Sequence, residues 1–234
     1  MIFRQFFEPE SATFTYLLGC ETSKQAVLID PVESEIPQYL RSLQALGLTL
    51  VYTMETHVHA DHVTAADSLR QRLGSKSVVH RDAGASCGDW LVSDGTHIQV
   101  GSLDIDVRYT PGHTRGCVSY HVDDRIFTGD ALLINGCGRT DFQQGDAGLL
   151  YDSIHQQIFS LPDATLVYPG HDYHGNSVST VGREKRDNQR LGGDRTRAEF
   201  IDIMANLKLA YPKHIDVALP ANQACGRTMP KQSA

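Results

Sequence analysis

Four side chains that can bind a metal ion stand within six consecutive positions, in the stretch His57-Val58-His59-Ala60-Asp61-His62. Imidazole nitrogen and carboxylate oxygen together suit Zn, Fe or Mn. The alternative is a polar turn in which Asp61 caps a helix and the histidines are exposed. Because so many potential ligands rarely share one turn, we expect a metal site that starts at His57.

The stretch joins two predicted elements. Residues 50–56 are rich in Val, Tyr, Thr and Met and indicate a buried strand. Residues 61–73 place apolar side chains at helical spacing and are followed by Gly74, a common helix terminator. A turn between a strand and a helix can direct several side chains to one point, which favours the metal site over the polar turn.

Two blocks of strands, each accompanied by helices, run along the rest of the chain. Such blocks favour two sheets packed face to face with helices outside. Because no linker is evident, we expect a single domain over 1–234 with a short helical C-terminal tail over about 172–234. The further elements that we expect are strands at 13–19, 26–30, 78–79, 98–100, 103–107, 118–122, 125–128 and 165–168, and helices at 36–46 and 149–159.

The composition indicates a globular protein. Of 234 residues, 41% are hydrophobic and 21% charged, which is ordinary for a folded domain. A net charge of −7 gives no support to nucleic-acid or anionic-membrane binding, which both need a basic surface. No run approaches 18 apolar residues, so no membrane span is expected.

The cysteines and the N-terminus predict a cytoplasmic protein. The start, Met1-Ile2-Phe3-Arg4, lacks the apolar stretch of a secretory signal. The five scattered cysteines form no C-x-x-C pair, so we expect reduced thiols in place of a disulfide framework. We interpret Cys117 and Cys137, each beside a glycine, as packing residues and not as nucleophiles.

Three further candidate ligands each follow a predicted strand. His113 lies in Thr110-Pro111-Gly112-His113, Asp130 in Thr128-Gly129-Asp130, and His171 in Tyr168-Pro169-Gly170-His171. Each of these motifs is weak by itself. Three of them in series after His57 suggest that all these side chains converge at one sheet edge.

In order and context this series resembles the ligand series of the metallo-β-lactamase-like superfamily. The resemblance implies an α/β fold, an αββα sandwich of two packed mixed sheets with helices on the outer faces and the metal site at one edge. In two-metal members, one ion takes His57, His59 and His113. The other takes Asp61, His62 and His171, and Asp130 bridges the two.

Two glutathione-handling branches of this superfamily are similar to the chain at 136–139. One is the two-zinc hydroxyacylglutathione hydrolases (glyoxalase II), and the other is the persulfide dioxygenases. The segment Gly138-Arg139-Thr140-Asp141-Phe142-Gln143, Cys117 where the hydrolases tend to have His, and residues 170–181 favour the dioxygenases. The short stretch after His171 and the ending Pro220-Ala221-Asn222 agree, whereas Gln189 departs from a frequent Pro.

The dioxygenase resemblance implies a reaction and a set of roles. One non-haem Fe(II), held by His57, His113 and Asp130, would oxidise glutathione persulfide with O2 and water to sulfite and glutathione, in sulfide and sulfane-sulfur oxidation. Zinc is the alternative metal, in the hydrolase; a catalytically silent binding module is the third possibility. We expect a homodimer on general grounds.

The remaining implied residues surround this iron. His59, Asp61, His62 and His171 would orient the ligands, relay protons or hold a second ion. Arg139, Tyr173 and Arg190 would bind glutathione, because a guanidinium fork suits a carboxylate.

Overall fold

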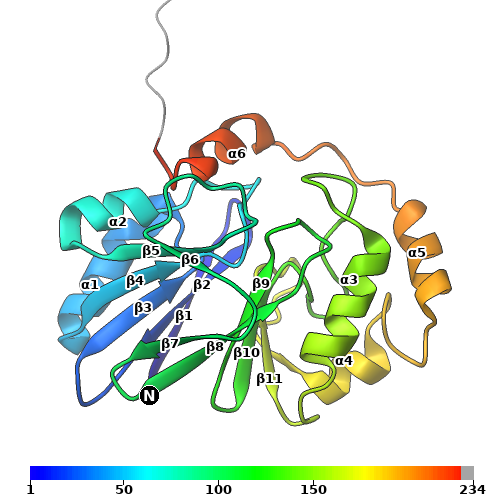
Figure 1. Ribbon diagram of the computed structural model, residues 1–234, viewed down its shortest axis with the longest axis horizontal. Helices are drawn as coiled ribbons and strands as arrows, with labels where there is room; N and C mark the ends of the chain where they lie inside the picture. The colour runs from blue at the N-terminus through cyan, green and yellow to red at the C-terminus, as the bar shows by residue number, and fades with distance from the viewer. Residues whose placement is uncertain (228–234) are drawn as a thin grey trace, which may run out of the picture.

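The computed structural model describes residues 1–227 and contains two six-stranded sheets packed against each other (Figure 1). The first sheet has the order β1-β2-β3-β4-β5-β6 and the second β12-β11-β10-β9-β8-β7. The strands of the first sheet are β1 (Ile2–Glu8), β2 (Thr13–Gly19), β3 (Gln25–Ile29), β4 (Thr49–Met54), β5 (Lys76–His80) and β6 (Trp90–Val92). Those of the second are β7 (Thr96–Val100), β8 (Leu103–Tyr109), β9 (Val118–Val122), β10 (Arg125–Gly129), β11 (Leu166–Pro169) and β12 (Ser179–Thr180).

Both sheets are mixed. In the first, β1 to β3 pair antiparallel and β3 to β6 pair parallel. In the second, β7 to β10 form an antiparallel meander, β11 pairs parallel with β10, and β12 pairs antiparallel with β11. The carboxyl ends of β4, β8, β10 and β11 therefore all lead into loops that can carry functional side chains.

Helices cover the outer faces, as expected for an αββα sandwich (Figure 1). On the first sheet these are α1 (Ile36–Leu46), preceded by the short 3-10 helix Glu33–Glu35, and α2 (Ala66–Leu73). On the second they are α3 (Ala147–Ser153), which continues into the π-helical turn Ile154–Ile158, α4 (Val181–Asp187) and α5 (Arg197–Ala205). The last helix, α6 (Ile215–Gln223), lies across one end of both sheets.

The interior between the sheets is an apolar cluster. Tyr16, Ile29, Ile98, Tyr120 and Phe127 are all buried in it. They come from alternate positions of strands in both sheets, which is how period-two patterns bury one face. At the site end, Phe14 N donates to Gly170 O and Gly170 N to Gly129 O, both at 2.8 Å. The two sheets are thus joined by backbone hydrogen bonds at the edge where the candidate ligands lie.

Most predicted elements are present, but the expected helix at 61–73 begins only at Ala66. The prediction for residues 61–65 is wrong because tertiary partners take their backbone groups. Thr64 N donates to Asn222 Oδ1 at 2.9 Å, Ala65 N to Pro31 O at 2.7 Å, and Val63 O accepts from Glu33 N at 2.9 Å. The short strands β6 and β12 and the N-terminal strand β1 were not predicted.

The expectation of five reduced thiols is also wrong in this structure. Cys87, in the loop between β5 and β6, forms a disulfide with Cys225, just beyond α6. Their Cα atoms lie 5.8 Å apart although 138 positions separate them in the chain. Sequence spacing could not reveal this pair, because the fold alone brings the two loops together. Cys20, Cys117 and Cys137 are free and buried.

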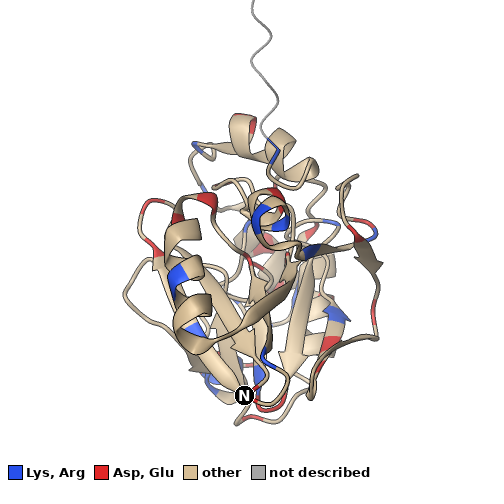
Figure 2. Cartoon of the chain, turned by 90° about the vertical axis from the view of Figure 1, so that its left-hand side faces the viewer, with Lys and Arg blue, Asp and Glu red and all other residues tan. Residues whose placement is uncertain are grey.

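Charged residues are mixed over the surface. Figure 2 shows acidic and basic positions interspersed on the helices and loops of one face. Among the described residues, no helix is both long and apolar enough to cross a membrane.

Candidate metal centre

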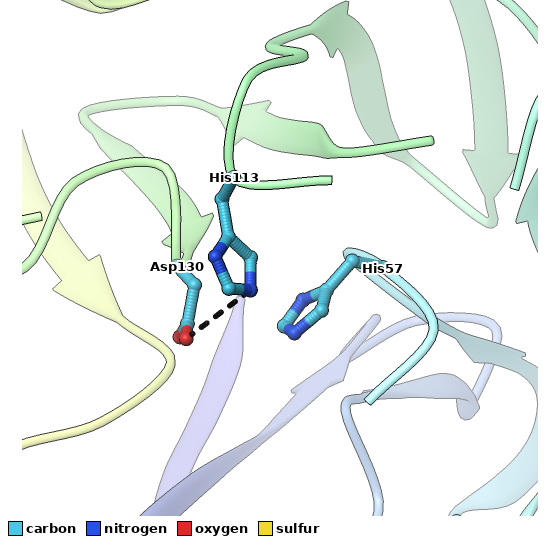
Figure 3. Close-up of side chains that lie close together, drawn as sticks. All are labelled: His57, His113 and Asp130. Atoms are coloured by element: carbon cyan, nitrogen blue, oxygen red, sulfur yellow. Dashed lines mark ion pairs between the residues drawn. The ribbon is translucent and has the colours of Figure 1, made fainter. Parts of the chain in front are cut away.

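His57, His113 and Asp130 come together from three different loops (Figure 3). His57 follows β4, His113 follows β8, and Asp130 directly follows β10. One potential ligand atom from each residue lies within 4.8 Å of those of the other two. His57 is buried and the other two are half-buried, so the cluster is partly accessible to solvent. One ion could contact all three side chains at this spacing.

A hydrogen-bond chain orients the ring of His57. Thr56 Oγ1 donates to Asp30 Oδ2 at 2.7 Å and lies 3.0 Å from His57 Nδ1. Because the threonine proton is committed to Asp30, the threonine oxygen accepts from Nδ1–H, which leaves the lone pair on Nε2. Burial, together with the nearby His59 and His113, holds the pKa of His57 well below its usual range. His57 is therefore neutral, as a metal ligand must be.

The ring of His113 is held by a backbone carbonyl. Its Nδ1 donates to Arg139 O at 2.6 Å, and its Nε2 lies 3.6 Å from Asp130 Oδ2. A Cβ on Gly138 would come within 2.5 Å of Asp130 O and 2.8 Å of His113 Nδ1. Only glycine allows the loop to pass this close to both ligands, so the residue beside Arg139 helps to shape the centre.

The donor atoms fit a divalent cation. Asp130 Oδ1 is buried and has no hydrogen-bond partner among the described residues. A buried carboxylate oxygen without a partner is costly unless a cation satisfies it. Two imidazole nitrogens and one carboxylate leave further coordination positions open, and such sets bind Fe or Zn.

A second potential ligand set adjoins the first. His59, Asp61 and His62 also place one ligand atom each within 4.8 Å of one another. His171 Nε2 lies 3.7 Å from Asp61 Oδ2 and 3.4 Å from Asp130 Oδ1, so it connects the two sets. His59 Nδ1 and His62 Nε2 are buried and lack partners within the described chain. All seven residues predicted to surround the metal therefore meet at one edge.

Comparison with known proteins places this centre in a family. The model of the metallo-β-lactamase superfamily matches residues 9–171. Human persulfide dioxygenase ETHE1, mitochondrial, is 50% identical over 233 residues, covering 98% of this chain and 91% of that protein. The chain belongs to the persulfide dioxygenase family of this superfamily.

Solved structures agree with this family. The crystal structure of ETHE1 from Myxococcus xanthus superimposes with a TM-score of 0.95 at 53% identity, covering 97% of this chain and 100% of that one. A hydroxyacylglutathione hydrolase from Polaromonas is 34% identical over 178 residues, 73% of this chain and 66% of that protein. The persulfide dioxygenases match more of the chain, and match it better, than this hydrolase does.

The three residues assigned to glutathione differ in their exposure and in their contacts with the rest of the protein. Tyr173 is 69% exposed, and its ring stacks on His171 with the centroids 6.1 Å apart. Arg139 donates to Ala210 O at 2.8 Å, and its guanidinium lies over the Phe142 ring. Arg190 donates to Cys137 O at 2.5 Å. Both arginines therefore support loop backbone, and Tyr173 alone presents most of its side chain to solvent.

The free cysteines near the centre are packing residues. Burial raises the pKa of Cys117 to about 12 and that of Cys137 to about 11. Both thiols are therefore protonated at neutral pH and unsuited to nucleophilic attack. Cys137 Sγ lies 3.8 Å from Met204 Sδ in an apolar cluster.

Sequence reasoning missed the residues that hold the ligands in place. Asp30 accepts from Thr56 N and Oγ1 at 2.7 Å and lies 3.1 Å from His59 Nε2. Its position at the end of an apolar strand gave the same signal as Asp130, and that signal could have identified it. Asn222 contacts the same loop from 158 or more positions away, and no local pattern in the sequence predicts this contact.

Proposed function

We propose that this chain is a persulfide dioxygenase that converts glutathione persulfide, O2 and water to sulfite and glutathione. The observation that carries the proposal is the 50% identity to human persulfide dioxygenase ETHE1 over 98% of the chain. The convergence of His57, His113 and Asp130 within 4.8 Å supports it, because the reaction needs a metal with open positions. The sulfane sulfur is oxidised, O2 is reduced, and glutathione leaves as the thiol.

We propose Fe(II) as the resident metal, with His57, His113 and Asp130 as its ligands. Bound iron would supply the redox chemistry between the persulfide sulfur and O2. The chain contributes preorganisation: Thr56 and the Arg139 carbonyl fix the two imidazole tautomers. The carboxylate of Asp130, whose Oδ1 is buried, provides the negative charge that retains a divalent cation.

Four residues would surround this iron and orient its ligands or relay protons: His59, Asp61, His62 and His171. His59 Nε2 lies 3.1 Å from Asp30 Oδ1 and 3.3 Å from Glu55 Oε2, so its ring is fixed. His171 reaches toward Asp130 and is positioned to influence that ligand directly. For glutathione, we propose Arg139, Tyr173 and Arg190 as contacts, with Tyr173 the most accessible of the three.

A two-zinc thioesterase is the second candidate function. The unpartnered nitrogens of His59 and His62 favour it, because they belong to a second potential ligand set. One experiment separates the two functions. An iron-replete preparation is assayed for O2 uptake with glutathione persulfide and for cleavage of lactoyl-glutathione, with metal analysis of the same sample. Near one Fe per chain with O2 uptake supports the dioxygenase; near two Zn with thioester cleavage overturns it.

We further propose a single domain and a homodimer. The pairing of β12 with β11 and the hydrogen bonds from α6 to the loop of His57 support one domain, because the C-terminal part contributes to the same site. The homodimer follows only from general frequency. The animal relatives are named mitochondrial, and a cytoplasmic location of this chain stays a prediction.

A further inference from the structure

The side chain of Asn222, in the last turns of α6, holds the backbone of the loop that carries the ligands. Its amide nitrogen donates to His59 O at 2.8 Å and to His62 O at 2.7 Å. Its Oδ1 accepts from Thr64 N at 2.9 Å. Asn222 is only 4% exposed, and these bonds use both donors and the acceptor of the amide.

These three bonds matter because residues 57–64 have no regular structure of their own. The loop lies between the end of β4 at Met54 and the start of α2 at Ala66. Within it, His59 O and His62 O would otherwise be carbonyls without a ladder or helix partner. Asn222 therefore ties three backbone groups of this loop, which places His57 in one ligand set and His59 and His62 in the other, to α6. Elsewhere in the loop, Val58 O accepts from Gln143 Nε2 and Val63 O from Glu33 N.

A covalent bond fixes α6 beside this loop. Three positions after Asn222, Cys225 forms the disulfide with Cys87. Around this bond, Ser86 N donates to Gln223 O at 3.1 Å and Asp67 N to Cys225 O at 3.0 Å. A Cβ on Gly226 (φ +90) would come within 2.2 Å of Thr64 O, so the chain passes in direct contact with the ligand loop.

The rest of α6 is held by non-covalent packing of Ile215, Ala218 and Ala221, which are buried. Val217 is 67% exposed, and Pro220 interrupts the hydrogen-bond ladder inside the helix. The segment that leads from α5 to α6 contains no helix or strand between Ala205 and Ile215. Figure 1 shows α6 at the end of the sandwich, reached through this long connection. Among the described residues, the disulfide is thus the only covalent cross-link that keeps Asn222 on the loop.

We propose that Asn222 is a positioning residue for the metal-ligand loop and that the Cys87–Cys225 disulfide is a thiol-sensitive tether that keeps it in place. The consequence for catalysis rests on the function proposed above; the consequence for metal retention does not. The fitting ligand class is a small thiol, such as the glutathione that the proposed reaction releases. Cys87 is half-buried whereas Cys225 is 2% exposed, so attack occurs at the Cys87 sulfur.

Reduction of the Cys87–Cys225 disulfide needs no reagent other than glutathione. A glutathione thiolate attacks the sulfur of Cys87, a mixed disulfide forms, and Cys225 leaves as the thiolate and takes a proton. A second glutathione attacks the mixed disulfide and releases glutathione disulfide and the Cys87 thiol. Two electrons pass from two glutathione molecules to the protein disulfide, and α6 is then held only by non-covalent contacts.

The tether is tested by the rate at which an iron chelator removes metal from the loaded protein. Oxidised protein should show three free thiols after denaturation and five after reduction, because only Cys87 and Cys225 are paired. We expect the reduced protein and the Cys87→Ser variant to lose iron about tenfold faster than the oxidised protein, as loss of support around ligands does. Ser86→Ala is the matched control, because Ser86 contributes its backbone N–H and keeps the disulfide. Glutathione should not change the Cys87→Ser rate.

Asn222 is tested in the same assay with two variants. Asn222→Ala removes all three bonds, and Asn222→Asp keeps the acceptor for Thr64 N but loses the two donors. Both should lose iron about tenfold faster or more, and hydrogen exchange of residues 57–64 should rise in both. Asn206→Ala, at the exposed end of α5, should leave both readouts unchanged.

The outcomes separate this proposal from the proposed function. Equal iron loss from oxidised and reduced protein overturns the tether, and unchanged loss from both Asn222 variants overturns the positioning role. If Cys87→Ser fails to fold, reduction of the intact protein gives the same comparison. Faster metal loss with no O2 uptake in any sample would sustain the tether while refuting the dioxygenase.

Discussion

The guanidinium of Arg139 forms a two-point ion pair with the carboxylate of Asp141, with Nε to Oδ1 at 2.6 Å and Nη2 to Oδ2 at 2.7 Å. The carbonyl of the same arginine accepts from His113 Nδ1. The ion pair therefore fixes the backbone that orients one of the three candidate ligands. A substrate carboxylate would have to share this guanidinium with Asp141 or displace it.

This relationship makes Arg139 testable by a pair of variants. We expect Arg139→Ala to raise the KM for glutathione persulfide roughly tenfold, about 1.4 kcal/mol, through loss of substrate binding. Asp141→Ala frees the guanidinium and should leave KM unchanged or lower it. Steady-state O2 uptake measures both. If both variants instead lower kcat to the same extent, the pair serves the backbone beside His113 and not the substrate.

Asp130→Ala removes the only carboxylate of the proposed iron triad. We expect loss of bound iron and of O2 uptake, since two neutral imidazoles do not replace the charge. Metal analysis of purified protein and an oxygen electrode give the two readouts. Asp123→Asn, at an exposed turn with a left-handed backbone that Asn tolerates, is the control. Normal O2 uptake by the Asp130 variant would refute the assignment of this ligand.

Two variants of Tyr173 distinguish a hydrogen bond made by its hydroxyl from a stacking contact made by its ring. Its ring lies parallel to that of His171, with an interplanar angle of 10°. If the hydroxyl binds the tripeptide, Tyr173→Phe should raise KM by about fivefold to tenfold, the value of one hydrogen bond. Tyr173→Ala should raise it further. An unchanged KM in Tyr173→Phe with a raised KM in Tyr173→Ala would assign the contribution to the ring alone.

The ligands were predictable because each signal is local. His57, His113, Asp130 and His171 all stand just beyond apolar strands, and the sheets bring those strand ends to one edge. The family resemblance then implies which of these residues bind the iron and which surround it. The helix expected to start at Asp61 failed because its apolar spacing is also local, whereas the competing bonds to Pro31 and Asn222 are not.

The supporting contacts were not predictable for the same physical reason. The Cys87–Cys225 bond and the Asn222 bonds join segments that no period or spacing connects. A sequence also does not reveal that the guanidinium groups of Arg139 and Arg190 already have protein partners, and their contact with glutathione stays a prediction. Which charges remain free for a ligand is decided by tertiary structure.

Asp89 provides a pH-dependent test of the region around the disulfide. Its Oδ2 accepts from Ser77 N at 2.8 Å and from Arg70 Nη2 at 2.6 Å, and Arg70 also donates to Cys87 O at 3.0 Å. Burial acts to raise the pKa of Asp89, but the bonds from Ser77 and Arg70 outweigh it and lower the pKa below its usual value. The charged carboxylate is therefore the form that the folded state favours.

The sign of the pH effect follows from linkage. A carboxyl group whose pKa is lowered on folding stabilises the protein above the unfolded pKa, near 3.9 for Asp, and loses this contribution as the pH falls through the folded pKa. We expect Asp89→Asn to lower the free energy of unfolding at pH 7 by roughly 0.5–1 kcal/mol, because the pair is partly exposed and screened. Urea unfolding at several pH values should show the difference from the unmodified protein shrink below about pH 4. Asp123→Asn should show no such trend, and a difference that persists at acid pH would mean that the amide acts through packing and not through charge.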